Sequence, residues 1–198
     1  MPRAGLDPAA VVTLALAVVD DGGPTGFADL TLAAVAQRAG VAVPSLYKHV
    51  AGLPALRREV ARQCIEQLAD TLEQTAEGRH GSECLAELAW TMRRFAHQHP
   101  GRYAATQTDL LGLPAEASAL HAAAARTVAV VARAVGEVGV PPERHVDAVR
   151  AVRSAVHGFV VLEATGGFGM PDDLEVSFDY LVTGLVGALD RTSASQRS

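Results

Sequence analysis

The sequence predicts an all-α protein with a small N-terminal unit and a larger C-terminal one. Apolar residues make up 49% of the 198 positions, whereas aromatic residues account for only 5%. Alternating apolar and polar runs between turn residues, which would indicate strands, are hard to find. Apolar residues recur instead at helical spacing. A chain of this length can bury a sizeable core in one or two domains.

The first predicted helix begins at Asp7 and Pro8, a capping side chain followed by a proline suited to the first helical position. Gly22, Gly23 and Pro24 end it. We expect this helix to brace the segment that follows. Its inner face carries a stripe of apolar residues: Val11, Leu14, Ala15 and Val18.

Residues 31–50 are predicted to form two short helices around a glycine turn. Gly40 stands where the first helix must stop, and glycine enters the left-handed backbone region at little cost. Leu46 and Val50 mark the inner face of the second helix at i, i+4. The inner face of the first helix carries Leu32, Val35, Ala36 and Ala39. A helix–turn–helix of this kind places its second helix in the major groove of DNA.

This segment resembles the helix-turn-helix of the tetracycline-repressor family. The match rests on Pro44–Val50 (Pro-Ser-Leu-Tyr-Lys-His-Val), close to the family's Leu-Tyr-x-His-Phe/Val signature. Residues 29–31 and 35–41 fit the same pattern, and the match extends over roughly residues 8–60. The resemblance implies that Thr31 caps the first of the two helices beside a DNA phosphate. It also implies contacts with the groove, the bases or the DNA backbone by Val43, Pro44, Ser45, Tyr47, Lys48 and His49.

The residue types agree with that implication in outline. The hydroxyl of Ser45, the ammonium of Lys48 and the imidazole of His49 suit phosphate contacts, whereas Val43 and Pro44 offer only apolar contact. Polar contacts are common in the family where this chain has Leu32, Ala33, Ala42, Val43 and Leu53. We therefore expect a shallow salt dependence of DNA binding. The alternative is a protein with the family fold and decayed DNA binding that acts by binding small molecules.

Charge is unevenly distributed along the chain. The net charge is −5, but residues 1–62 carry six basic and five acidic side chains, against 11 and 17 in the remainder. The slight basic excess therefore lies on the segment that carries the helix-turn-helix.

The rest of the chain predicts a helical C-terminal domain over residues 54–190, after a DNA-binding domain over 1–53 and before a disordered tail over 191–198. Pro54 opens a linking helix that extends to Thr75, and Pro141 and Pro142 open a later one. Further helices are expected over residues 83–98, 115–138 and 173–189, with a short helix at Arg102 and Tyr103.

The C-terminal part is also similar to the Trp-His-Gly type of ligand domain found in some relatives of the family. Residues 155–160 (Ala-Val-His-Gly-Phe-Val) and 97–103 carry this similarity, with Val156 in place of the tryptophan. It implies a cavity for a small, largely apolar ligand. The expected lining comprises Trp90, Phe95, Tyr103, Leu111, His157 and Phe159. His157 is either a polar anchor or a core histidine satisfied by a neighbouring helix.

The last two helices are expected to form a homodimer interface with two-fold symmetry. Small residues on these helices would permit close approach. The alternative is that these faces complete the core of a monomer. The predicted interface residues are Val156, Val160, Ala164, Leu181, Gly184, Leu185 and Ala188.

Other functional classes receive little support. Cys64 and Cys84 form no CxxC motif, so we expect reduced thiols, and His97 and His99 do not complete a metal site. No common catalytic motif, signal peptide or charge-free membrane span is found. The sequence thus predicts a cytoplasmic, homodimeric, ligand-responsive repressor of a palindromic DNA operator, without a cofactor or membrane contact. An all-α enzyme is the remote alternative.

Overall fold

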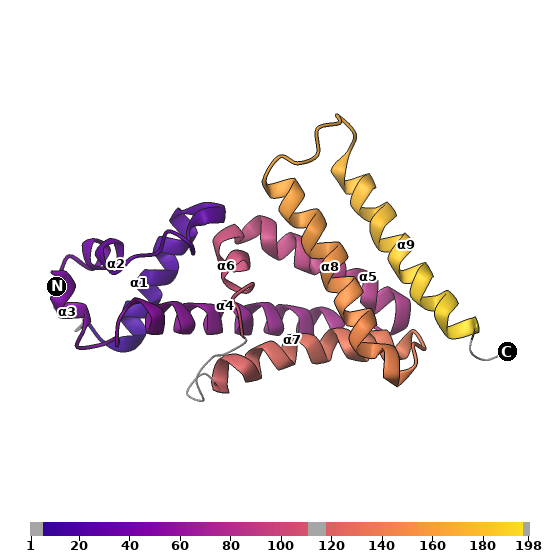
Figure 1. The fold of residues 1–198 in the computed structure, drawn as a ribbon, viewed down its shortest axis with the longest axis horizontal. Helices are drawn as coiled ribbons and strands as arrows, with labels where there is room; N and C mark the ends of the chain where they lie inside the picture. Colours follow the sequence, from indigo (N-terminus) through magenta and orange to yellow (C-terminus); the bar gives the residue numbers. More distant parts are fainter. Residues whose placement is uncertain (1–5, 111–117, 196–198) are drawn as a thin grey trace. The chain divides into compact units, whose positions relative to one another are not determined.

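The computed structural model describes residues 6–110 and 118–195, and every regular element in these ranges is a helix (Figure 1). This confirms the predicted all-α class. In chain order the elements are α1 (Pro8–Asp21), the 3₁₀ turn η1 (Gly23–Thr25), α2 (Leu32–Ala39), α3 (Val43–Leu46), α4 (Leu53–Ala76), α5 (Gly81–Gln98), α6 (Pro100–Ala105), α7 (Ser118–Glu137), the 3₁₀ turn η3 (Pro142–Arg144), α8 (His145–Ala164) and α9 (Leu174–Ser195).

The chain divides into two compact units. The first comprises Met1–Gln67 and Gln98–Ala123, and the second comprises Leu68–His97 and Ala124–Ser198. The division falls within α4, whereas the sequence places it before residue 54. The physical reason is that Val60 and Cys64 of α4 are buried in the core of the first unit. Helices α4 and α7 therefore contribute residues to both units.

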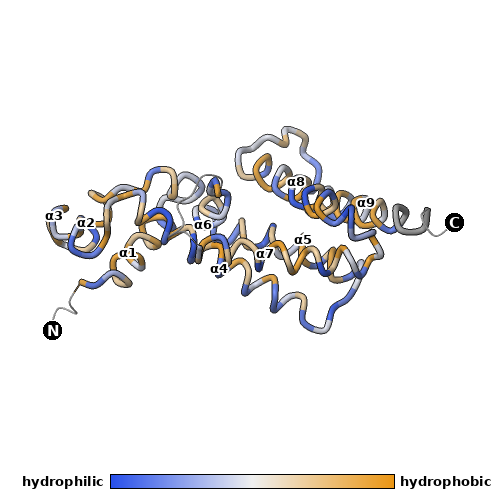
Figure 2. The backbone as a smooth tube through the Cα atoms, turned by 60° about the horizontal axis from the view of Figure 1, so that its bottom comes forward, coloured by the Kyte–Doolittle hydropathy of each residue, from blue (hydrophilic) through white to orange (hydrophobic). Residues whose placement is uncertain are grey.

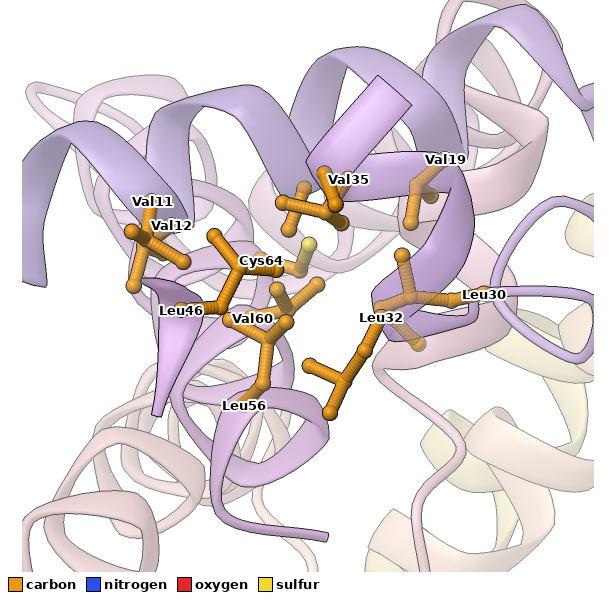
Figure 3. Packing of buried hydrophobic residues seen from close by; sticks show 13 residues of the cluster. Val11, Val12, Val19, Leu30, Leu32, Val35, Leu46, Leu56, Val60 and Cys64 are labelled. Carbon is orange, nitrogen blue, oxygen red and sulfur yellow. The ribbon is translucent and has the colours of Figure 1, made fainter. Parts of the chain in front are cut away.

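The core of the first unit is built from α1, α2, α3, α4 and α6. Val11, Val35, Leu46 and Leu56 have no exposed surface, and Ala105 of α6 belongs to the same cluster. Figure 3 shows the labelled side chains of α1, α2, α3 and α4 pointing toward one another. Burial of these side chains holds the short helices in place, since isolated helices of such length are marginal in water.

The N-terminal end of α1 confirms the predicted cap. The Asp7 side chain accepts a hydrogen bond from the backbone N–H of Ala10 at 2.7 Å, and Pro8 occupies the first helical position. The helix ends at Asp21, directly before the glycines that the sequence places at its end.

Helix α6 packs against the C-terminal end of α1 at a glycine. A Cβ atom on Gly101 would lie 2.5 Å from the carbonyl oxygen of Val19 and 2.7 Å from that of Gly23. The adjacent Arg102 donates from Nε to Oδ1 of Asp20 at 2.7 Å and from Nη1 to the side-chain oxygen of Gln67 at 2.9 Å. The first unit thus holds α6 by close backbone packing and by a charge-assisted hydrogen-bond network.

The second unit packs α5, α8 and α9 with parts of α4 and α7. Figure 2 shows hydrophobic and hydrophilic stretches alternating along α5 and α8, as expected for helices with one buried face. Leu72, Leu85, Leu88, Val135 and Phe178 are fully buried or nearly so.

Helix α7 is, among the described residues, the one helix long and apolar enough by length and composition to cross a membrane. Val131, Ala134 and Val135 on this helix are buried in the second unit. Arg126 pairs with Asp70 and Glu73. One face of α7 is therefore packed inside the protein, and charged side chains interrupt the other.

The ends of two predicted helices differ from the structure or lie beyond it. Helix α9 extends to Ser195, past the predicted end at residue 189. The predicted start of α7, residue 115, lies outside the described residues.

Candidate nucleic-acid interface

The interface begins at Thr31, which caps α2. Its backbone is extended, with φ −131° and ψ 155°, and its hydroxyl accepts a hydrogen bond from the N–H of Ala34 at 3.2 Å. Its carbonyl oxygen accepts the first helical bond from the N–H of Val35 at 3.2 Å. The predicted cap is confirmed, and its side chain lies at an exposed position.

The turn after α2 is a Schellman motif. Gly40 has φ 67° and donates from its N–H to the carbonyl oxygen of Gln37 at 3.1 Å. The N–H of Val41 reaches the carbonyl oxygen of Ala36 at 3.0 Å, and the Val41 side chain packs against the core. This confirms the predicted glycine turn and determines the direction in which the chain enters α3.

Helix α3 is shorter than the predicted helix, since it ends at Leu46 instead of Val50. Ala42 precedes it and supplies no side-chain cap. The N–H groups of His49 and Val50 both bond to the carbonyl oxygen of Leu46, at 2.9 and 3.0 Å. This tightened turn brings the half-buried Val50 against the core of the first unit.

The side chains at the end of α3 differ sharply in exposure. Leu46 is fully buried, whereas Tyr47 is 60% exposed and Lys48 is exposed. Within the part of the chain that the structure describes, Lys48 forms no ion pair. Arg38, the other exposed cation on the two short helices or their turns, pairs with Asp21. Lys48 is therefore available to a phosphate.

The remaining predicted DNA-contacting residues of α3 and the turn after it differ in exposure. Pro44 is exposed, Ser45 and His49 are half-buried, and Val43 packs partly against the core. Val43 thus has less free surface for a groove contact than the sequence pattern suggests.

The apolar character of the outer surface is weaker than the sequence indicates. Leu32 is buried and Leu53 packs against the core, so neither occupies the place of a polar contact on the surface. Of the positions on α2, Ala33 is exposed, and Gln37 lies one turn later on the same face. Sequence reasoning missed Gln37, although its spacing of four residues from Ala33 could have indicated it.

A separate aromatic group lies in the second unit. Trp90 of α5 contacts Phe178 of α9 edge to face, with ring centroids 4.8 Å apart. Phe159 of α8 lies 5.0 Å from Phe178 and 4.7 Å from Phe168. Of the predicted ligand residues, the structure therefore brings Trp90 and Phe159 to one cluster, with Phe178 as the common neighbour.

Arg93 occupies the middle of this aromatic cluster. Its guanidinium carbon lies 5.1 to 5.7 Å from the ring centroids of Trp90, Phe159 and Phe178. Its Nε and Nη2 donate to the Glu163 carboxylate at 2.9 and 2.6 Å. Hydrogen bonds from Arg93 hold the pKa of Glu163 below its usual range, despite partial burial. Arg93 was not predicted, because an arginine on the flank of a helical stripe ordinarily faces water.

The other predicted ligand residues do not join this cluster as one set. Tyr103 is buried in the first unit, and Leu111 lies outside the described residues. Phe95 is buried and His157 is half-buried. Burial lowers the pKa of His157, and the nearby positive charge of Arg153 lowers it further by a smaller amount.

The predicted dimer residues fall into two classes. Val156 and Val160 are 1% and 3% exposed, because they pack into the core of the second unit. Leu181 and Leu185 are half-buried, whereas Ala164, Gly184 and Ala188 are exposed. Part of the predicted set thus belongs to the core of the chain itself, and part lies at its surface.

Cysteine and metal-ligating residues add no further cluster to these sites. Cys64 and Cys84 are free and buried, and burial raises the pKa of the Cys64 thiol to about 12. Among residues 6–110 and 118–195, no three His, Cys, Asp or Glu side chains are grouped so that they could hold a metal ion.

Comparisons with known proteins point to one family. Residues 85–185 match the family described as "Tetracyclin repressor-like, C-terminal domain". The chain is 35% identical to the HTH-type transcriptional regulator Rv0681 of Mycobacterium tuberculosis over 84% of this chain and 75% of that protein. It is 30% identical to the HTH-type transcriptional regulator YobS of Bacillus subtilis over 95% of both chains. Among solved structures, the regulatory protein SCO4313 superimposes with a TM-score of 0.69 and 26% identity, covering 94% of this chain and 100% of that chain.

Proposed function

We propose that this chain, which belongs to the tetracycline-repressor family of transcriptional regulators, is a cytoplasmic repressor that binds a palindromic DNA operator as a homodimer. The observation that carries the proposal is the contrast at the end of α3, where Leu46 is buried and Tyr47 and Lys48 face outward. A buried anchor fixes the orientation of the exposed pair, and the pair supplies a polar ring and a cation.

Few cations serve this interface, which limits its electrostatic contribution. Lys48 is the one lysine of the chain, and Arg38 is already paired with Asp21. Each phosphate neutralised by the protein steepens the salt dependence of the binding constant by about 0.9 in a double-logarithmic plot. We therefore propose a shallow slope, with Thr31, Ser45 and His49 supplying hydrogen-bonding contacts.

The DNA contact can be tested by pairing Lys48→Ala with Arg126→Ala. Both substitutions remove one positive charge, but Arg126 lies in the second unit and pairs with Asp70 and Glu73. The operator is first selected from random DNA, and affinity is then measured by fluorescence anisotropy at several salt concentrations. Lys48→Ala should weaken binding and flatten the slope by about 1, whereas Arg126→Ala should change neither.

Two outcomes would contradict the DNA proposal. Unchanged affinity and slope in Lys48→Ala would remove that residue from the interface. Failure of the unmodified chain to enrich any sequence would favour the alternative of decayed DNA binding, in which the protein binds small molecules only.

A dimer is supported by an exposed apolar and small surface on α8 and α9. Val176, Tyr180, Gly184 and Ala188 recur at four-residue steps along α9 and are all exposed. On α8, Val161 and Leu162 are 41% and 47% exposed. Two such helices from each subunit can form a four-helix interface with two-fold symmetry. Gly184 and Ala188 belong to the interface predicted from the sequence, whereas Val161, Leu162, Val176 and Tyr180 are added to it here in place of the buried Val156 and Val160.

The dimer can be tested with Gly184→Arg. A Cβ on Gly184 has no atom within 4 Å, so the arginine fits on the single chain but places a charge in the proposed interface. Ala129→Arg on the exposed face of α7 is the matched control. Light scattering at micromolar concentration should give a dimer for the unmodified chain and the control, and a monomer for Gly184→Arg. A dimeric Gly184→Arg protein would place the interface elsewhere.

We further propose that a small, largely apolar ligand releases the DNA. Half-buried Trp90 and His157 are the aromatic and polar groups proposed to contact it. Such control requires that the ligand binds more tightly to the state with low DNA affinity. Trp90 is the single tryptophan of the chain, so its fluorescence reports on binding in a compound screen. Compounds that shift this fluorescence should also release DNA, and recovery of a chemically altered compound would favour the enzyme alternative.

A further inference from the structure

Arg57 forms an unusual bridge between α4 and the segment that enters α2. Its Nη2 donates to the backbone carbonyl oxygens of Ala28 at 2.6 Å and Leu30 at 3.1 Å. Its guanidinium carbon lies 6.0 Å from the centroid of the Phe27 ring. One side chain from α4 thus contacts three residues of the connection before α2.

The bridged segment leads directly to Thr31. The carbonyl oxygens of Ala28 and Leu30 precede α2, whose first helical bond is accepted by the carbonyl oxygen of Thr31. The fully buried side chain of Leu30 anchors one side of the segment, and Arg57 holds its carbonyl groups. Arg57 therefore links the segment directly before Thr31 to α4.

Part of the Arg57 guanidinium is already engaged within the protein. Both hydrogens of Nη2 are engaged by carbonyl oxygens, and Nε is buried without a hydrogen-bond partner among the described residues. A buried N–H group without a partner costs free energy, so it offsets part of the stability that the two hydrogen bonds of Nη2 contribute.

We propose that Arg57 is a positioning residue for DNA binding, which holds the entry to α2 against α4 so that Thr31 meets the DNA in the correct orientation. The inference rests on the DNA-binding function proposed above. It assigns to Arg57 an indirect role that acts through Thr31, without a phosphate contact of its own.

The test uses the full-length chain and the operator obtained by selection from random DNA. Arg57→Met removes the donors and keeps a long apolar side chain, and Arg57→Lys keeps the charge but not the planar group. Arg58→Met is the matched control. This neighbour is half-buried on the same helix, and its side chain forms no ion pair or hydrogen bond with the described residues. Circular dichroism and thermal unfolding select a temperature at which all variants are folded.

We expect Arg57→Met to weaken operator binding about tenfold, a size typical of one lost favourable interaction of this kind. The salt slope should stay at the value of the unmodified chain, because no phosphate contact is lost. Arg57→Lys should give a loss of the same sign, since lysine does not reproduce the stacked, planar contact. Arg58→Met should bind the operator as tightly as the unmodified chain when the two are compared along their salt-dependence lines.

A double-substitution cycle with Thr31→Ala separates positioning from general structural support. If Arg57 acts through Thr31, both substitutions remove the same interaction with DNA. The variant that carries both should then bind DNA about as well as the single variant with the lower affinity. Additive losses would overturn the inference, as would an unchanged affinity or a slope flattened by about 1. If Arg57→Met does not fold, Arg57→Lys is judged by the same criteria. Failure of the unmodified chain to enrich any DNA would overturn both proposals. If the unmodified chain enriches an operator and the Arg57 variants bind it with unchanged affinity, this proposal alone is overturned.

Discussion

The contact between Gly101 of α6 and the end of α1 makes a stringent prediction for Gly101→Ala. The added Cβ would lie 2.5 Å from the Val19 carbonyl oxygen, 2.7 Å from the Gly23 carbonyl oxygen and 2.9 Å from the Val19 side chain. Two of these three atoms belong to the backbone, so no rotation of a side chain can relieve the overlap. The helices themselves must move apart.

The expected size follows from two opposing effects. Alanine is favoured over glycine within a helix by about 0.5–1 kcal/mol. Overpacking of a closely packed contact costs about 1–3 kcal/mol, and the backbone contacts place this site at the upper end. We expect a net loss of about 2 kcal/mol, which for a chain of this size lowers the Tm by about 4–8 °C.

The measurement compares Gly101→Ala with Gly169→Ala. Gly169 has open space around its missing Cβ, so alanine there should leave the Tm unchanged or slightly raised by limiting the unfolded chain. Calorimetry gives the Tm, and hydrogen exchange of α6 amides such as that of Tyr103 localises the effect. A Tm for Gly101→Ala equal to or above that of Gly169→Ala would refute the reasoning, because it would show that the helices have room for the methyl group.

Two further predictions concern titratable groups. The pKa of Glu163 is lowered mainly by the hydrogen bonds from Arg93, so its stabilising contribution is present above the ordinary value of 4.5 and is lost as pH falls through the lower, folded pKa. Glu163→Gln should lower the free energy of unfolding at neutral pH by about 3 kcal/mol. It should also reduce the amount of stability that is lost as the pH falls. Urea titrations at several pH values measure both effects, and the same acid dependence in both proteins would contradict the prediction. Cys64, with its pKa raised to about 12 by burial, should react with a thiol reagent at pH 8 only after unfolding, and rapid labelling of the folded chain at Cys64, located by mass spectrometry, would show that the thiol is accessible.

The sequence by itself determined the features that depend on a few neighbouring residues. The caps at Asp7 and Thr31 and the left-handed turn at Gly40 were all predicted and are all present. Each is formed by hydrogen bonds between residues at most five positions apart. Local sequence is sufficient for such features, because the partner groups are near one another in any chain that begins or ends a helix there.

The tertiary structure alone decided which apolar and charged side chains are buried. Helical spacing placed Val156 on a dimer face, yet it packs inside the second unit. Arg93 is buried among aromatic rings because Glu163, 70 residues away in sequence, supplies its carboxylate. Periodicity identifies the faces of a helix, but the partner that covers each face comes from distant parts of the chain. The burial of a charge likewise depends on a counter-charge that only the folded chain brings near.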